Sequence, residues 1–258
     1  MLLNYDDYGP GPVVVLLHGF PLDRTFWRCQ RETLGSMYRV IAPDLRGHGR
    51  SAAPAGVYTI GEMAHDVVEL LDALEVREPV VVVGHSMGGY LALDLAVNHA
   101  RRLRGLVLIN TRAGADAPAT ATVREELARQ VEASGTAEAV VGSMIGKMFA
   151  PGSYERHAVA VGETKAQMER TSAVGVAGAL RGMAIRPDRT ADLAAIAVPS
   201  LVITGSEDQM IPPSESRSMA AAIPGATLVE IAGAGHMAPI EEPAAVNAAL
   251  LEFLRELK

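Results

Sequence analysis

The sequence predicts an α/β fold: a mostly parallel β-sheet flanked by helices, with a helical segment inserted between two of its strands. Short runs of Val, Ile and Leu alternate with longer segments of helical periodicity, which is typical of a parallel sheet covered on both faces. The block 112–197 lacks such strand-like runs, so we expect it to be helical. One apolar run also leads directly into a glycine-rich turn and then a helical pattern.

The expected strands are short, apolar and bounded by turn residues. They are Val13–Leu17, Arg39–Ala42, Val80–Val83, Leu106–Ile109, Leu201–Thr204 and Thr227–Ile231. The stretch that ends at Tyr8 can add one or two antiparallel strands at the edge of the sheet.

Two helices of the expected core have clear start signals. After Tyr58, Thr59 and Glu62 have the spacing of a capping box, in which each side chain accepts a hydrogen bond from the other residue's backbone N–H. The last helix is expected from about Pro243, because proline is favoured in the first turn. Apolar residues at helical spacing follow both signals.

The block 112–197 is too long for one crossover between neighbouring strands. We expect helices at Val123–Ala133, Ala137–Phe149 and Ser153–Arg170, separated by glycine and proline. The sequence thus predicts a core formed by residues 1–111 and 198–258, with residues 112–197 inserted as a helical cap.

Composition excludes several classes of protein. Of the 258 residues, 49% are hydrophobic, which is enough for a sizeable core and argues against disorder. The net charge of −7 argues against a nucleic-acid partner, because binding the phosphate backbone needs clustered cations. The only cysteine, Cys29, cannot form an intramolecular disulfide. The N-terminus lacks the features of a signal peptide and no apolar run could span a membrane, so we expect a cytoplasmic protein without a membrane partner.

The most informative motif is the run Val80–Tyr90, in which a buried strand leads into Gly-x-Ser-x-Gly and then a helix. Gly84 and Gly88 lack the Cβ atoms that would collide in so tight a turn. The turn presents the Ser86 hydroxyl beside the N-terminus of the helix, where backbone N–H groups and the helix dipole favour negative charge. Ser86 is therefore the candidate nucleophile, and the adjacent His85 is interpreted as structural because its side chain should point away.

A serine nucleophile needs a base, and histidine is the usual one near neutral pH. Among the seven histidines, His236 lies in a glycine-rich loop after the strand Thr227–Ile231, which can carry its side chain back over the sheet edge. The others lie on expected helices, on a glycine loop, in the insertion, or next to a glycine or the serine: His65, His99, His48, His157, His18 and His85.

With these motifs, the chain resembles enzymes of the α/β-hydrolase fold over essentially its whole length. The segment His18–Pro21 resembles the oxyanion loop of that family, which implies that the backbone N–H groups of Phe20 and Met87 form the oxyanion hole. The segment Asp44–Ser51 is similar to another glycine loop of the family. We interpret that loop as structural, with Asp44 or Arg46 holding it in place.

The resemblance also implies the rest of a catalytic triad. The family places its histidine in the kind of loop that carries His236, and its acid on the loop after the preceding strand. There both Glu207 and Asp208 are carboxylates, and the family pattern Gly-x-x-Asp-x-x-x-Pro falls on Asp208. The chain order Ser86, Asp208, His236 is that of this fold.

These parts predict attack of Ser86 on a carbonyl carbon and hydrolysis of the resulting acyl-enzyme. Related enzymes that open epoxides or displace halide have an aspartate at the position of Ser86, so the serine argues against both reactions. No metal or organic cofactor is implied.

The substrate is expected to be a small carboxylic ester or lactone. The cap side chains Met144, Met148 and Phe149, together with Trp27, could line an apolar pocket or simply form the core. A general carboxylesterase is favoured. A 3-oxoadipate enol-lactonase-like enzyme, a cofactor-free perhydrolase (haloperoxidase) and a ligand-binding or signalling relative remain alternatives.

Overall fold

The computed structural model describes residues 1–257 and contains one seven-stranded sheet, in the spatial order β1-β3-β2-β4-β5-β6-β7. Only β1 is antiparallel to its neighbour, β3. All other neighbours are parallel. The strands are β1 (Tyr5–Tyr8), β2 (Val13–Leu17), β3 (Arg39–Pro43), β4 (Val80–His85), β5 (Leu103–Ile109), β6 (Ser200–Gly205) and β7 (Thr227–Ile231). The predicted α/β fold and its six parallel strands are confirmed, with one antiparallel edge strand.

The strand order reverses direction between β2 and β4. The chain leaves β2 for β3 on one side and then crosses back to form β4 on the other side. Ligands of open α/β sheets bind at such a reversal, outside the carboxyl ends of the strands. Both His18–Pro21 and Ser86 lie directly after these strand ends.

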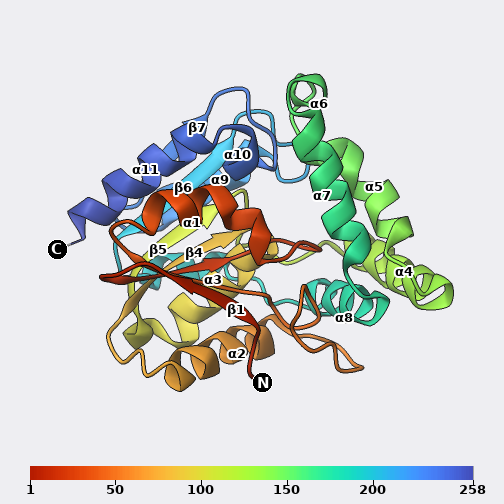
Figure 1. Cartoon of the computed structure of the whole chain (residues 1–258), viewed down its shortest axis with the longest axis horizontal. Helices are drawn as coiled ribbons and strands as arrows, with labels where there is room; N and C mark the ends of the chain where they lie inside the picture. The colour runs from red at the N-terminus through yellow and green to blue at the C-terminus, as the bar shows by residue number, and fades with distance from the viewer. Residues whose placement is uncertain (258) are drawn as a thin grey trace.

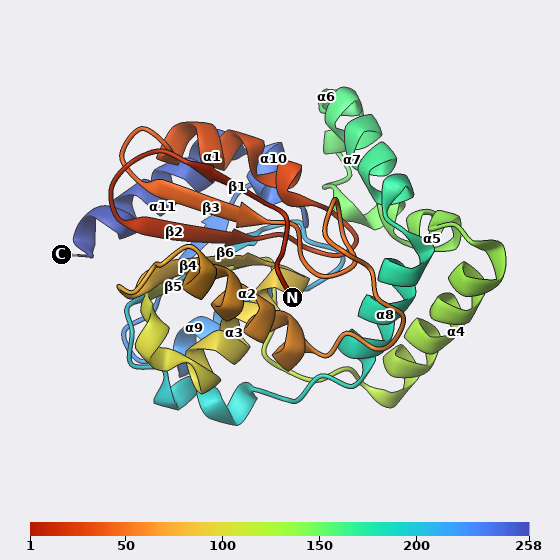
Figure 2. The same cartoon turned by 60° about the horizontal axis from the view of Figure 1, so that its bottom comes forward.

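Helices cover both faces of the sheet (Figures 1 and 2). On one face, α1 (Arg28–Leu34) lies beside α11 (Pro243–Glu256). On the other, α2 (Ile60–Ala73) packs against α3 (Met87–Asn98), and α9 (Pro213–Ala222) contacts β6 and β7.

The start of α2 matches its sequence signal. The Thr59 hydroxyl accepts a hydrogen bond from the backbone N–H of Glu62, and the Glu62 carboxylate accepts one from the backbone N–H of Thr59. The predicted capping box is therefore confirmed.

Five helices between β5 and β6 gather at one end of the sheet, on the right in Figures 1 and 2. They are α4 (Pro118–Ser134), α5 (Glu138–Met148), α6 (Ser153–Arg156), α7 (Ala158–Arg170) and α8 (Ala173–Ala184). The expected helix Ser153–Arg170 is divided at His157, and α8 was not predicted. Short helices complete the chain: η1 (Arg24–Trp27), η2 (Ala100–Arg102), η3 (Thr190–Ala195) and α10 (Ala238–Glu241). Within residues 1–257, no helix combines the length and apolar character needed to cross a bilayer.

Candidate active site

The turn between β4 and α3 is as tight as its glycines indicate. A Cβ atom on Gly84 would lie 2.3 Å from the carbonyl oxygen of Gly88, and one on Gly88 would lie 2.2 Å from that of Leu17. Ser86 has a positive φ of 52°, a conformation that side chains disfavour and that recurs at functional sites. The Thr111 hydroxyl donates a 2.8 Å hydrogen bond to the Ser86 carbonyl, which fixes the turn from β5.

Ser86, His236 and Asp208 come together although they are far apart in the sequence. His236 Nε2 lies 2.9 Å from the Ser86 hydroxyl oxygen, and His236 Nδ1 lies 2.8 Å from Asp208 Oδ2. His236 and Asp208 are buried, whereas Ser86 keeps some exposure. A serine bonded to a histidine that is oriented by a carboxylate is the arrangement of an activated nucleophile.

Asp208 is held as a carboxylate. Burial by itself raises its pKa, but the facing His236 and the surrounding N–H donors outweigh burial and hold the pKa below the usual value. Its Oδ1 accepts hydrogen bonds from the backbone N–H groups of Met210 and Ile211, at 2.8 and 2.9 Å. Its Oδ2 accepts a second bond, from the side-chain amide of Asn110 at 2.8 Å. Since this oxygen only accepts, the facing Nδ1 of His236 carries a proton and Nε2 is left to accept one from Ser86.

The segment His18–Pro21 lies beside the Ser86 turn. A Cβ on Gly19 would lie 2.6 Å from Nδ1 of His85 and 3.2 Å from the Cβ of Ser86, so a side chain at this position would have to displace the His85 ring. Met87 is the first residue of α3, and an N–H at that position has no acceptor within the helix. Within residues 1–257, the backbone N–H groups of Phe20 and Met87 therefore donate no hydrogen bond to the backbone outside the regular elements.

Three buried histidines surround this site. Burial lowers the pKa of His18 to about 4 and that of His48 and His85 to about 3, so all three are neutral at pH 7. The His18 ring donates from Nδ1 to the Gly19 carbonyl and accepts at Nε2 from the N–H of Leu45. It therefore holds the segment His18–Pro21 in place.

His85 Nε2 donates a 2.8 Å hydrogen bond to the carbonyl of His236. The ring of His85 thus supports the backbone of the His236 loop, and its hydrogen bond goes to that backbone and not to the serine hydroxyl, in agreement with its structural interpretation.

The Asp44–Ser51 loop is fixed by its acidic residue, as expected. The Asp44 carboxylate accepts hydrogen bonds from the backbone N–H groups of Arg24 and Arg50 at 2.9 and 2.8 Å. Arg46 forms a two-pronged ion pair with Asp66 of α2, at 2.7 and 2.8 Å. Neither residue reaches Ser86 through these contacts.

The proposed pocket residues need correction. The side chains of Trp27, Met148 and Phe149 have no exposed surface, so they belong to the hydrophobic core and cannot contact a substrate in this conformation. Met144, the fourth proposed pocket residue, is half-buried. The sequence pattern could not separate the two interpretations, because apolar residues on a cap helix line a pocket or pack inward with the same spacing.

Sequence reasoning also missed three supporting residues: Asn110, Thr111 and Glu241. Asn110 and Thr111 follow β5 directly, and polar residues after a buried parallel strand at the same sheet edge as Ser86 would have been a usable signal. Glu241 has no such signal; its carboxylate accepts hydrogen bonds from the backbone N–H groups of Gly235, six residues earlier, and of the distant Ala150.

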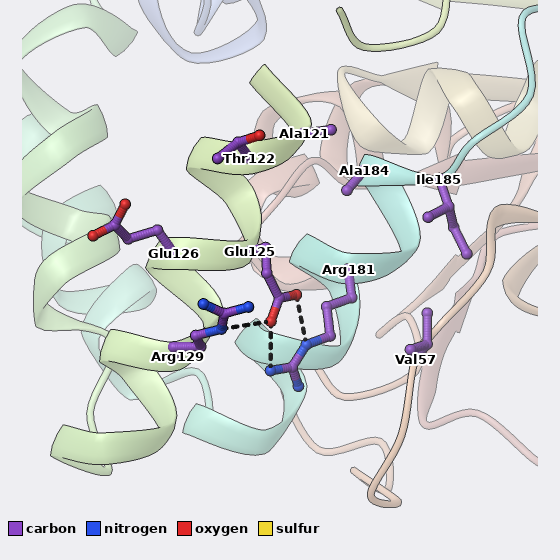
Figure 3. A pocket seen from close by; sticks show the side chains of 9 residues that line it. All are labelled: Val57, Ala121, Thr122, Glu125, Glu126, Arg129, Arg181, Ala184 and Ile185. Carbon is purple, nitrogen blue, oxygen red and sulfur yellow. Dashed lines mark hydrogen bonds and ion pairs between the residues drawn. The ribbon is translucent and has the colours of Figure 1, made fainter. Parts of the chain in front are cut away.

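A separate surface groove of about 560 Å³ lies between α4 and α8, away from these residues (Figure 3). Three of its charged groups are paired with one another: Arg181 binds Glu125 at 3.0 Å, and Glu125 also binds Arg129 at 3.1 Å. None of Ser86, Asp208 and His236 lines it. Among the residues that the structure describes, no three His, Cys, Asp or Glu side chains converge as a metal site would require.

Fold and site together define the class: an α/β-hydrolase fold with a serine at the turn between β4 and α3. The chain belongs to the alpha/beta hydrolase fold family, which it matches over residues 12–243.

Several relatives have named activities. A thermophilic esterase from Thermogutta terrifontis, solved with malate bound, has a TM-score of 0.97 and 40% identity, with 99% of this chain and 93% of that chain covered. A 3-oxoadipate enol-lactonase of Acinetobacter baylyi is 28% identical over 96% of this chain and 91% of its own length. Epoxide hydrolase A of Mycobacterium tuberculosis is 32% identical, over 96% of this chain and 92% of its own length.

Proposed function

We propose that this protein is a serine hydrolase that cleaves a small carboxylic ester or lactone through an acyl-enzyme on Ser86. The observation that carries the proposal is the continuous hydrogen-bonded chain from Asp208 through His236 to Ser86. Hydrolysis is also the reaction class in the names of several relatives.

The geometry supports the following steps. His236 Nε2 takes the proton of Ser86 as the serine oxygen attacks the carbonyl carbon, and the N–H groups of Phe20 and Met87 stabilise the oxyanion. The imidazolium then gives its proton to the alkoxide, which departs as an alcohol. The acyl group remains bound to Ser86 as an ester. Water, deprotonated by the same nitrogen, cleaves this ester and returns the serine hydroxyl.

Among the reactions of the named relatives, ester or lactone cleavage fits the nucleophile best. Attack on a carbonyl passes through an oxyanion, which the N–H groups of Phe20 and Met87 would stabilise; among residues 1–257 neither has a backbone partner outside the regular elements. Epoxide opening in this fold relies on an aspartate at the nucleophile position, as the family pattern implies, and this chain has a serine there. A lactone is a cyclic ester and is cleaved by the same acyl transfer, so an enol-lactone, as in the name of the Acinetobacter relative, is the second candidate substrate.

Turnover of a panel of short-chain nitrophenyl esters and small lactones tests the proposal. We expect the wild type to hydrolyse at least one member, and Ser86→Ala to lower kcat for that member by about 10³-fold or more, because removing the nucleophile removes the acyl-enzyme route. Thr111→Val is a matched control. It removes the hydroxyl that bonds to the Ser86 carbonyl but keeps the Ser86 hydroxyl, so the loss of kcat should be far smaller. Full turnover by Ser86→Ala would exclude the mechanism.

A further inference from the structure

Glu241 is a buried carboxylate that the proposed mechanism does not use. It lies at the end of α10 and is 1% exposed. Its Oε1 accepts a 2.9 Å hydrogen bond from the backbone N–H of Gly235, directly before His236. Its Oε2 accepts a 2.8 Å bond from the backbone N–H of Ala150, two residues after α5 ends. One carboxylate therefore joins the His236 loop to the inserted helices.

The two segments that Glu241 joins are in direct backbone contact. A Cβ on Gly235 would lie 2.3 Å from the nitrogen of Ala150 and 2.6 Å from the carbonyl carbon of Phe149. The N–H of Met237 also donates a 3.1 Å hydrogen bond to the carbonyl of Met148. The chain between α5 and α6 thus rests on the loop that carries His236, without a side chain between them.

The opposite side of this loop is fixed to the core by two hydrogen bonds. Asn110 donates to the carbonyl of Gly235 at 3.2 Å, and His85 donates to the carbonyl of His236 at 2.8 Å. Both bonds join neutral groups, since burial keeps His85 uncharged. The two bonds from Glu241 complete the support from the cap side, and a charged acceptor makes such bonds stronger.

We infer that Glu241 is a positioning residue that holds His236 against Ser86 by tying its loop to the segment between α5 and α6. This inference rests on the proposed role of His236 as the base. A displacement of about 1 Å at a catalytic group can lower the rate by about 10²-fold, and Glu241 holds the residue next to the base. The segment between the inserted helices α5 and α6 thereby supports the base.

Glu241→Gln tests this inference, because it keeps the volume but turns one acceptor oxygen into an NH₂ group that faces a backbone N–H. For the ester on which the wild type turns over, we expect kcat to fall by about 10- to 100-fold and KM to stay within about three-fold. The second-order rate of Ser86 labelling by a fluorophosphonate should fall in parallel with kcat.

Asp94→Asn is the matched control, as it makes the same chemical change at another buried carboxylate. Asp94 lies on α3 and pairs with Arg189 and Asn98, far along the helix from Ser86. We expect Asp94→Asn to lower the melting temperature but to keep kcat within about two-fold at temperatures where it is folded. Glu241→Gln with a lowered melting temperature and wild-type kcat would show a structural role only and overturn the inference.

Gly235→Ala provides an independent variant should Glu241→Gln fold poorly. Its Cβ must push the His236 loop and Ala150 apart, so we expect the same loss in kcat; wild-type kcat in this variant would also contradict the inference. Labelling that persists in Ser86→Ala would instead refute the proposed function, so the two failures are distinguishable.

Discussion

Asp208→Asn is expected to lower kcat by about 10⁴-fold while leaving the protein folded, which is the size of effect that the same change has in serine proteases. Asp208 Oδ1 accepts two backbone N–H groups and Oδ2 accepts from His236 and Asn110. An asparagine oxygen would stay with the two backbone donors, so its NH₂ group would face His236 Nδ1. That nitrogen would then have to accept, Nε2 would carry the proton, and it could no longer take one from Ser86.

The neighbouring carboxylate offers a control for this prediction. Glu207→Gln makes the same chemical change one residue earlier, at an exposed side chain, and we expect kcat within about two-fold of the wild type. The measurement is kcat on the ester identified with the wild type, with circular dichroism to confirm folding. If Asp208→Asn is no slower than Glu207→Gln, Asp208 does not orient the base.

Acid is expected to destabilise the protein steeply between about pH 6 and pH 4, and the loss begins above the usual pKa range of carboxylates. The folded state keeps His18, His48 and His85 neutral, with the pKa at about 4, 3 and 3, whereas in the unfolded chain each has a pKa near 6.5. Below pH 6.5 the unfolded state therefore binds more protons, and stability falls as the pH falls. Each histidine contributes up to about 1.4 kcal/mol per pH unit, or about 4 kcal/mol for the three together.

Urea unfolding between pH 7 and pH 4.5 measures this effect. We expect uptake of close to three protons on unfolding near pH 5 from these three residues. His48→Asn should reduce the slope by about one proton, because it removes one of the three titrating rings. The asparagine amide can still donate to the carbonyl of Arg46, which the His48 ring contacts. A slope below one proton in the wild type would show that the buried rings are protonated in the folded state.

The parts of the site that the sequence predicts best are those formed by neighbouring residues. The turn around Ser86 depends on Gly84 and Gly88, each two residues from the serine, where a Cβ would lie 2.3 Å from the Gly88 carbonyl oxygen and 2.2 Å from that of Leu17, respectively. The capping box at Thr59 is equally local. By contrast, Asp208 and His236 were located by their loops and by family resemblance, since nothing local brings them to Ser86.

The elements that the sequence did not predict depend on tertiary contacts. The helix α8 contains three glycines, which weaken a helical pattern. In the structure a Cβ on Gly175 would lie 1.8 Å from the carbonyl oxygen of Gly47, and one on Gly182 would lie 1.6 Å from that of Tyr58. These glycines allow α8 to approach the core, which no pattern within the segment reveals. Glu241 is a similar case, because one of its two partners is the backbone N–H of Ala150, 91 residues earlier in the chain.

The most direct test of the central claim is to locate the adduct that a fluorophosphonate forms with the intact protein. Mass spectrometry after digestion should find one labelled peptide, modified at Ser86, and Ser86→Ala should gain no mass. His236→Ala should label far more slowly, because the serine loses the base that lies 2.9 Å away. Labelling at another residue, or an unchanged adduct in Ser86→Ala, would contradict the assignment of Ser86 as the nucleophile.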